Sequence, residues 1–286
     1  MTDTTSGAIA SYYDNLSRFL DLARRVGRGG GSQQGSTHRF LAGVAGEADD
    51  PAAGPQRLDR LVLEAALAAG LATSPRVVDA GCGLGGTIFH WQRTVGGRYD
   101  GLTLSPEQAK RATEDAARRG LAHDCTFHVR SYHAGLEGPY DAAIAIESLA
   151  HSQDPADAIS NLARALAPKG LFVIVDDMPE PAAEAALLRG FKAGWRIPAL
   201  LDHAGFQRAL SAAGLQIVRD VDLTARLRPR PLAWLKILLA VFGALRALAP
   251  SRGARDVLDA LRGGFFLEAL YRTNGMRYRM IVAAKG

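Results

Sequence analysis

The sequence of 286 residues, 48% of them hydrophobic, is long enough for one large domain or for a domain with a smaller cap. Its net charge is +5, and its opening stretch MTDTTSGAIASYYDNL has no basic start leading into an apolar run, so we expect no secretory signal and a cytoplasmic location. Cys82 and Cys125 give neither a disulfide framework nor the spacing of a zinc site, so both are interpreted as free thiols.

The N-terminal part predicts helices. Over residues 6–27 apolar side chains recur every three or four positions, which is typical of an amphipathic helix. That helix ends at the stretch GRGGGSQQGS, a flexible loop, and a second helix is expected over residues 55–71. We interpret residues 1–56 as an N-terminal helical lid.

Strands and helices then alternate along the chain. Short β-branched runs predict strands at residues 76–81, 99–104, 125–131, 140–147 and 170–178. Helices are expected near residues 85–95, 105–120 and 155–168. Two further strands, at 215–224 and 276–285, bring the number to seven. The pattern indicates an α/β fold with a mostly parallel seven-stranded sheet and helices on both faces.

The segment from 181 to 286 combines those last two strands with a predicted helical lid over the substrate. Residues 224–286 hold ten Arg and two Lys against three acidic residues, which points to a polyanionic partner unless it is only a solvated helix face. The stretch 231–250, PLAWLKILLAVFGALRALAP, is apolar but too short and too charged for a transmembrane helix. It favours an interfacial or substrate-covering helix, with peripheral contact at the inner membrane surface through residues 231–262.

Four glycines follow the first predicted strand in the stretch RVVDAGCGLGGTIFHW. Gly81, Gly83 and Gly86 satisfy the dinucleotide pattern G-x-G-x-x-G, and Asp100 lies about 20 residues further on. Asp79, however, would repel a diphosphate at this turn, whereas it suits the ammonium and sulfonium of S-adenosylmethionine. The turn therefore favours S-adenosylmethionine over NAD, with a purely structural glycine turn as the alternative.

Three motifs resemble those of the class I S-adenosylmethionine-dependent methyltransferases over about residues 57–180: VVDAGCGLGG, GLTLSPEQ and YDAAIAIESLAH. GLTLSPEQ is similar to a segment of cyclopropane fatty acid synthases and tocopherol methyltransferases, and AIESLAH resembles one of sterol and terpenoid C-methyltransferases. The resemblance implies a Rossmann-like core for residues 57–180. It also implies cofactor contacts from Asp79, Gly81, Cys82, Gly83, Gly85, Thr103, Leu104, Gln108, Ser131, Tyr132 and Ile146.

Two positions depart from the family pattern. Where many members have an acidic residue that holds the ribose, this sequence has Thr103, Leu104 and Ser105. We therefore expect Gln108 and the backbone around Thr103 to hold the ribose and adenine, with Asp100 in a structural role. Ala150 replaces the Glu that precedes the His in cyclopropane synthases, which disfavours cyclopropanation.

Glu147 and His151 follow the fourth predicted strand, at the sheet edge where open α/β proteins bind ligands. Four residues apart, they would share a face of one helical turn. If the nucleophile is a double bond, Glu147 can stabilise the carbocation, and either residue can take the proton. For a phenol or amine, His151 with an ordinary pKa of roughly 6.5 suits a base. The alternative is that both residues only order the loop.

Further aromatic and histidine side chains are candidates for the substrate pocket. Tyr12 and Tyr13 lie on the first predicted helix, and the stretch YYD resembles part of this family's lid. Aromatic faces can contact a sulfonium or a developing cation. His38 and Trp195 are weaker candidates. His123, His128 and His133 recur every five residues, a spacing that places neighbours on opposite faces of a strand, so we expect no metal site.

The sequence thus predicts a methyltransferase that acts on a lipophilic small molecule. C-methylation of a terpenoid, sterol-like or prenylated acceptor is the leading hypothesis, followed by O- or N-methylation of a natural product. A non-catalytic module that binds S-adenosylmethionine or lipid at a membrane surface is the rival from another class. We expect no nucleic-acid partner, because the basic C-terminal part is the only feature that favours RNA.

Overall fold

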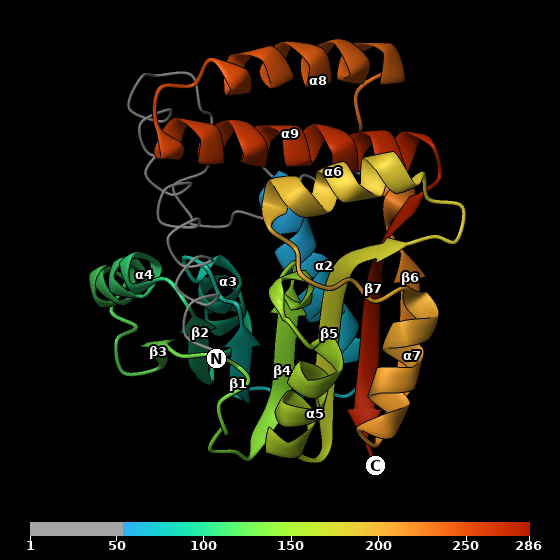
Figure 1. Ribbon diagram of the computed structural model, residues 1–286. Coiled ribbons are helices and arrows are strands. Elements are labelled where there is room, and N and C mark those ends of the chain that lie inside the picture. Colours follow the sequence, from blue (N-terminus) through green and yellow to red (C-terminus); the bar gives the residue numbers. More distant parts are fainter. Residues whose placement is uncertain (1–53) are drawn as a thin grey trace.

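A computed structural model describes residues 54–286 (Figure 1). Seven strands form one sheet in the order β3-β2-β1-β4-β5-β7-β6, and only β7 runs antiparallel to its neighbours. The strands are β1 (Arg76–Ala80), β2 (Arg98–Thr103), β3 (Cys125–Val129), β4 (Tyr140–Ile146), β5 (Leu166–Pro179), β6 (Leu215–Asp222) and β7 (Met276–Lys285). The predicted mostly parallel seven-stranded sheet is confirmed.

Two hydrophobic cores cover the two faces of the sheet, because alternate strand residues point to opposite sides. In β5, Val173 and Val175 belong to one core, and Phe172 and Ile174 belong to the other. The first core includes α2 (Gly54–Ala68) and α3 (Gly86–Val95), and the second includes α5 (Pro155–Ala165) and α7 (His203–Ala212). Helices therefore lie on both faces, as predicted.

Local capping fixes where two helices begin. The Ser105 hydroxyl accepts from the Gln108 backbone N–H at 3.1 Å and starts α4 (Pro106–Arg118). At the start of α5 the Asp154 carboxylate accepts from the Asp157 backbone N–H at 3.0 Å. In both helices a proline occupies the first turn, where its missing N–H has no intrahelical partner to lose.

Three helices form a layer over the end of the sheet at which β5 finishes (Figure 1). They are α6 (Ala185–Trp195), α9 (Arg252–Arg272) and, outermost, α8 (Leu232–Ala247). A Cβ on Gly194 would lie 2.5 Å from the Cα of Gly263, so α6 and α9 approach through bare backbone. The Trp195 indole Nε1 donates to the Ala260 carbonyl at 2.9 Å across the same contact. This layer occupies the region predicted as a lid.

The predicted N-terminal elements fall largely outside the described residues. The helix expected at 6–27 and the candidates Tyr12, Tyr13 and His38 all belong to that part of the chain. The helix expected over 55–71 is α2, which ends three residues earlier than predicted. β5 begins earlier than the expected 170–178, because Leu166 pairs with Tyr140 ahead of a register shift in the β4–β5 ladder.

Candidate active site

In the glycine turn after β1, the backbone conformation and the close neighbours disfavour side chains at the glycine positions. Gly81, Gly83 and Gly85 have φ values of +101°, +54° and +80°, which side chains rarely adopt. A Cβ on Gly81 would lie 2.5 Å from the Cβ of Ser148, the second residue after the end of β4. The backbone N–H groups of Gly81 and Cys82 both donate to the Leu102 carbonyl at 2.9 Å. The turn is thus held against the ends of β2 and β4.

We expect Gly81→Ala to lower the free energy of unfolding by about 1 to 3 kcal/mol, because it combines a strained φ with contact against Ser148. Thermal denaturation measures this effect. Gly264→Ala on α9 is the matched control, since nothing lies within 4 Å of its added Cβ and alanine favours a helix. Equal melting temperatures for the two variants would contradict the proposed crowding.

Asp79 lies near the carboxyl end of β1 and is only 4% exposed. Burial, together with the smaller effect of the neighbouring Asp59 carboxylate, raises the pKa of Asp79 to about 8. Asp59, on α2, accepts from the Thr87 hydroxyl at 2.7 Å. A buried carboxyl with this pKa gains most from a ligand that brings a positive charge. This acidic group therefore fits the ammonium of S-adenosylmethionine, and Asp59, which the sequence did not single out, lies close enough to Asp79 to affect its charge.

The end of β2 presents a polar edge instead of a carboxylate. The Thr103 hydroxyl donates to the Gln108 side-chain oxygen at 2.8 Å and accepts from the Ser105 N–H at 3.1 Å. Leu104, between them, is half-buried. The structure thus brings together Thr103 and Gln108, the pair predicted to hold the ribose and adenine.

Asp100 lies three residues before the end of β2, away from that edge. Its carboxylate accepts from the hydroxyls of Thr126 at 2.7 Å and Tyr140 at 2.9 Å, and it forms an ion pair with Arg76 at 3.6 Å. These contacts join β1, β2, β3 and β4. They agree with the structural role predicted for this residue.

The segment after β3 reaches the same sheet edge. The Tyr132 hydroxyl donates to the Ser148 carbonyl at 3.2 Å, and the Ser131 hydroxyl accepts from the His133 N–H at 3.1 Å. Ile146, the last residue of β4, is buried. The predicted residues at the ends of β3 and β4 therefore lie beside each other, with Tyr132 as the link.

The three regularly spaced histidines do not converge. His123 contacts the Asp124 carboxylate, His128 that of Asp100 and His133 that of Asp157. Across residues 54–286 no group of three or more His, Cys, Asp or Glu is placed to hold a metal ion.

Glu147 directly follows β4 in a left-handed conformation, with φ +52°. Its N–H donates to the Val175 carbonyl at 2.7 Å, and its carboxylate Oε1 accepts from the Tyr278 hydroxyl, also at 2.7 Å. For a residue other than glycine this φ is strained and is held by surrounding contacts, as is common at functional sites. The strand ends and β7 thus fix the carboxylate at the sheet edge.

His151 ends a short 3-10 turn, η2 (Leu149–His151). The expectation that Glu147 and His151 share one α-helical turn is wrong, because the chain leaves β4 through the left-handed residue before η2 starts. They still interact: burial lowers the pKa of His151 to about 4, and the nearby Glu147 carboxylate opposes that decrease. The ordinary imidazole pKa expected from the sequence is therefore also wrong, since desolvation disfavours the imidazolium.

Asp176, near the end of β5, supports the turn beside Glu147 and His151 and was not predicted from the sequence. It is buried, and its carboxylate accepts from the N–H groups of Ala150 at 3.3 Å and Asp177 at 2.9 Å. Burial, followed by the charges of Asp177 and Glu147, raises its pKa to about 7. The signal in the sequence is an acidic pair that ends an otherwise apolar strand. Through Ala150 this carboxyl supports the turn that carries His151.

Trp195 packs between helices in this structure. Its ring lies 5.2 Å from that of Phe191, edge to face, and a Cβ on Gly263 would lie 2.4 Å from the indole. These contacts tie α6 to α9, so the predicted contact of Trp195 with a substrate stays a prediction.

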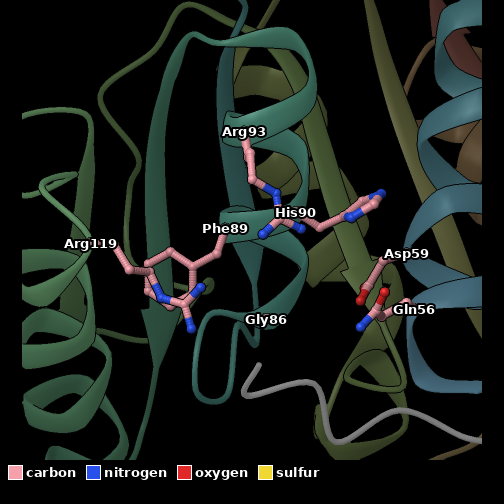
Figure 2. Close-up of a pocket in the computed structure, with 7 residues that line it drawn as sticks. All are labelled: Gln56, Asp59, Gly86, Phe89, His90, Arg93 and Arg119. Carbon is pink, nitrogen blue, oxygen red and sulfur yellow. The ribbon is translucent and has the colours of Figure 1, made fainter. Parts of the chain in front are cut away.

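A small recess opens beside α3, on the helix side of the glycine turn (Figure 2). In it the Arg119 guanidinium lies 4.7 Å from the centre of the Phe89 ring, while Asp59 projects from α2. None of the predicted cofactor residues lines it. The lining residues are Gln56, Asp59, Gly86, Phe89, His90, Arg93 and Arg119.

The comparisons with known proteins decide the family. Residues 52–220 match the family described as "Methyltransferase domain". The chain belongs to this methyltransferase family. It is 28% identical to tocopherol O-methyltransferase of Arabidopsis thaliana over 222 residues, which are 73% of this chain and 63% of that protein. It is 31% identical to 2-methyl-6-phytyl-1,4-hydroquinone methyltransferase of Synechocystis over 160 residues, 51% of this methyltransferase and 49% of the relative.

Solved structures share the fold at low sequence identity. Geranyl diphosphate C-methyltransferase from Streptomyces coelicolor superposes with a TM-score of 0.71 at 21% identity, covering 100% of this chain and 99% of that one. The cyclase SpnF gives a TM-score of 0.73 at 21% identity, with coverage of 97% and 94%. The matched region spans between about half and two thirds of the first curated relatives. The family is thus established.

Proposed function

We propose that this methyltransferase uses S-adenosylmethionine to methylate a carbon of a lipophilic small molecule, a terpenoid, sterol-like or prenylated acceptor. The observation that carries the proposal is Glu147, held by Tyr278 at the edge where the glycine turn, Thr103 and Gln108 meet. When bound, S-adenosylmethionine supplies an electrophilic methyl group on its sulfonium. Asp79 would accept a hydrogen bond from the ammonium, and the backbone from Gly81 to Gly85 would lie close to the methionine part of the cofactor. Gln108 and the Thr103 backbone would hold the ribose and adenine.

The acceptor step then depends on residues of this chain. Methylation of a double bond leaves a carbocation, and the Glu147 carboxylate is placed to stabilise this charge. His151, with a pKa of about 4, is neutral near pH 7 and a weak base, which favours Glu147 as the proton acceptor. The relatives' names support the acceptor class: they include a 2-methyl-6-phytyl-1,4-hydroquinone methyltransferase and a sterol 24-C-methyltransferase of Aspergillus fumigatus.

O- or N-methylation of a natural product is the second candidate, supported by relatives named tocopherol O-methyltransferase and norajmaline N-methyltransferase. Peripheral contact of residues 231–262 with the inner membrane surface accompanies either activity in this proposal. No helix within residues 54–286 has both the length and the apolar character that crossing a membrane requires.

Calorimetry with S-adenosylhomocysteine and with NAD tests the cofactor, and we expect binding of the first alone. The acceptor is tested by incubating a lipid extract with the enzyme and methyl-labelled cofactor, followed by mass spectrometry. We expect the label on a carbon of a prenylated or sterol-like product. Tight NAD binding without a response to S-adenosylhomocysteine would remove the cofactor assignment, and label confined to oxygen or nitrogen would favour the second candidate.

A further inference from the structure

Helix α8 packs on α9 with one side and leaves an apolar face outward. Leu235, Leu239 and Phe242 belong to the small core that it shares with α9. Away from that core lie Trp234, Ile237, Val241, Leu245 and Leu248, which are 61%, 53%, 48%, 47% and 80% exposed. Successive members are three or four residues apart, so they form one stripe along the helix. A continuous exposed apolar stripe marks an interaction surface, whereas scattered apolar residues do not.

Basic side chains surround this stripe at both ends. Arg228 precedes α8, Lys236 lies on it, and Arg252 and Arg255 follow it; all four are exposed. Among residues 54–286 none of the four has an ion-pair partner, while Arg230 pairs with Glu268 at 2.8 Å. No Asp or Glu occurs between residues 224 and 255. The surface therefore combines an apolar centre with uncompensated positive ends.

These charges decide which occupant the stripe fits. A second copy of the chain, packed α8 against α8 in either direction, would bring basic ends against basic ends. An anionic lipid surface instead neutralises both ends while the apolar stripe enters the boundary between headgroups and acyl chains. We propose that the outward face of α8 docks this enzyme on an anionic membrane.

Docking in this way turns the layer of α6, α8 and α9 toward the membrane. Helix α8 is the outermost element above α9 and α6, on the side where the site lies (Figure 1). The purpose of docking rests on the proposed function, because only a lipophilic acceptor would be drawn from the bilayer. The docking itself is measured without cofactor or acceptor.

Trp234 is a built-in probe of this contact. Trp91 is fully buried and Trp195 is packed against Phe191, so Trp234 alone of the three tryptophans is largely exposed. With full-length protein and phosphatidylcholine vesicles containing phosphatidylglycerol, we expect flotation, a blue shift of tryptophan emission and reduced quenching by iodide. Vesicles of phosphatidylcholine alone should give much weaker binding.

Two pairs of variants separate the apolar and charged contributions. The double variant Ile237→Glu, Val241→Glu should abolish flotation, whereas Val218→Glu on β6, replacing a side chain that is 52% exposed, should retain it. The double variant Arg252→Gln, Arg255→Gln should bind anionic vesicles about 10-fold or more weakly. Arg98→Gln with Arg208→Gln, which removes two exposed charges elsewhere, should have little effect.

Wild-type protein that fails to float with anionic vesicles would overturn the proposal. So would a dimer in light scattering that the Ile237→Glu, Val241→Glu variant dissociates, because a second copy would then cover the stripe. Methyl transfer from labelled cofactor to a detergent-solubilised lipid extract distinguishes the failure of docking from the failure of the proposed function. Transfer without flotation rejects docking alone, and flotation without any transfer rejects the proposed function alone.

Discussion

Replacing Glu147 with Gln is expected to reduce turnover on the order of 100-fold or more, while S-adenosylhomocysteine binds within a few-fold of wild type. The carboxylate is placed against a charge that develops only in the transition state, so its removal affects turnover more than ground-state affinity. Glutamine preserves the shape of the side chain and its capacity to accept from the Tyr278 hydroxyl. Turnover is measured with labelled cofactor, and affinity by calorimetry on the same protein.

Tyr278→Phe provides the matched test of how the carboxylate is held. It removes the hydroxyl that donates to Glu147 at 2.7 Å, and we expect a smaller loss of turnover in the wild-type background. In the Glu147→Gln background the same substitution should have little further effect, because residues that act through one contact are not additive. Wild-type turnover in Glu147→Gln would instead leave Glu147 as a residue that only orders the loop after β4.

The sheet was predictable because its strands are short β-branched runs that need no partner to be recognised. VVDA, YDAAIAI and FVIVDDM read as buried strands, and each lies within two residues of its predicted end. Apolar residues on both sides of these strands required helices on both faces. The early start of β5 was missed, because it depends on pairing with Tyr140 across the sheet.

The site was predicted only where a local motif marked it. Glycines with positive φ and the residues after β2 and β4 carry their signal in a few neighbouring positions. Asp59 and Tyr278 lie 20 residues before Asp79 and 131 residues after Glu147, and only the fold brings each to its partner. The same holds for the pKa of His151, which is set by burial that the sequence does not encode locally.

Asp79→Asn is expected to weaken S-adenosylhomocysteine binding by at least ~1.5 kcal/mol near pH 7.5, because a charge-assisted contact to the ligand ammonium is lost. In the free enzyme the pKa of Asp79 is about 8, well above the ordinary aspartate value. The folded protein therefore holds one more proton than the unfolded chain between about pH 4 and pH 8. The stability that this proton contributes is complete below about pH 4 and is lost as the pH rises through 8.

The free enzyme favours the protonated form of Asp79, and binding of an ammonium reverses this preference because the cation stabilises the carboxylate. Near pH 7 binding should release close to one proton, and affinity should fall by up to about tenfold per pH unit below 8. Calorimetry in two buffers of different ionisation enthalpy measures the proton. In Asp79→Asn the proton release should vanish and the affinity should become independent of pH in this range.

Asp59→Asn is the control: it removes the neighbouring charge that raises the pKa of Asp79, so the same pH dependence should move to lower pH. Proton release that persists in Asp79→Asn would assign the titration to another group and detach Asp79 from the cofactor.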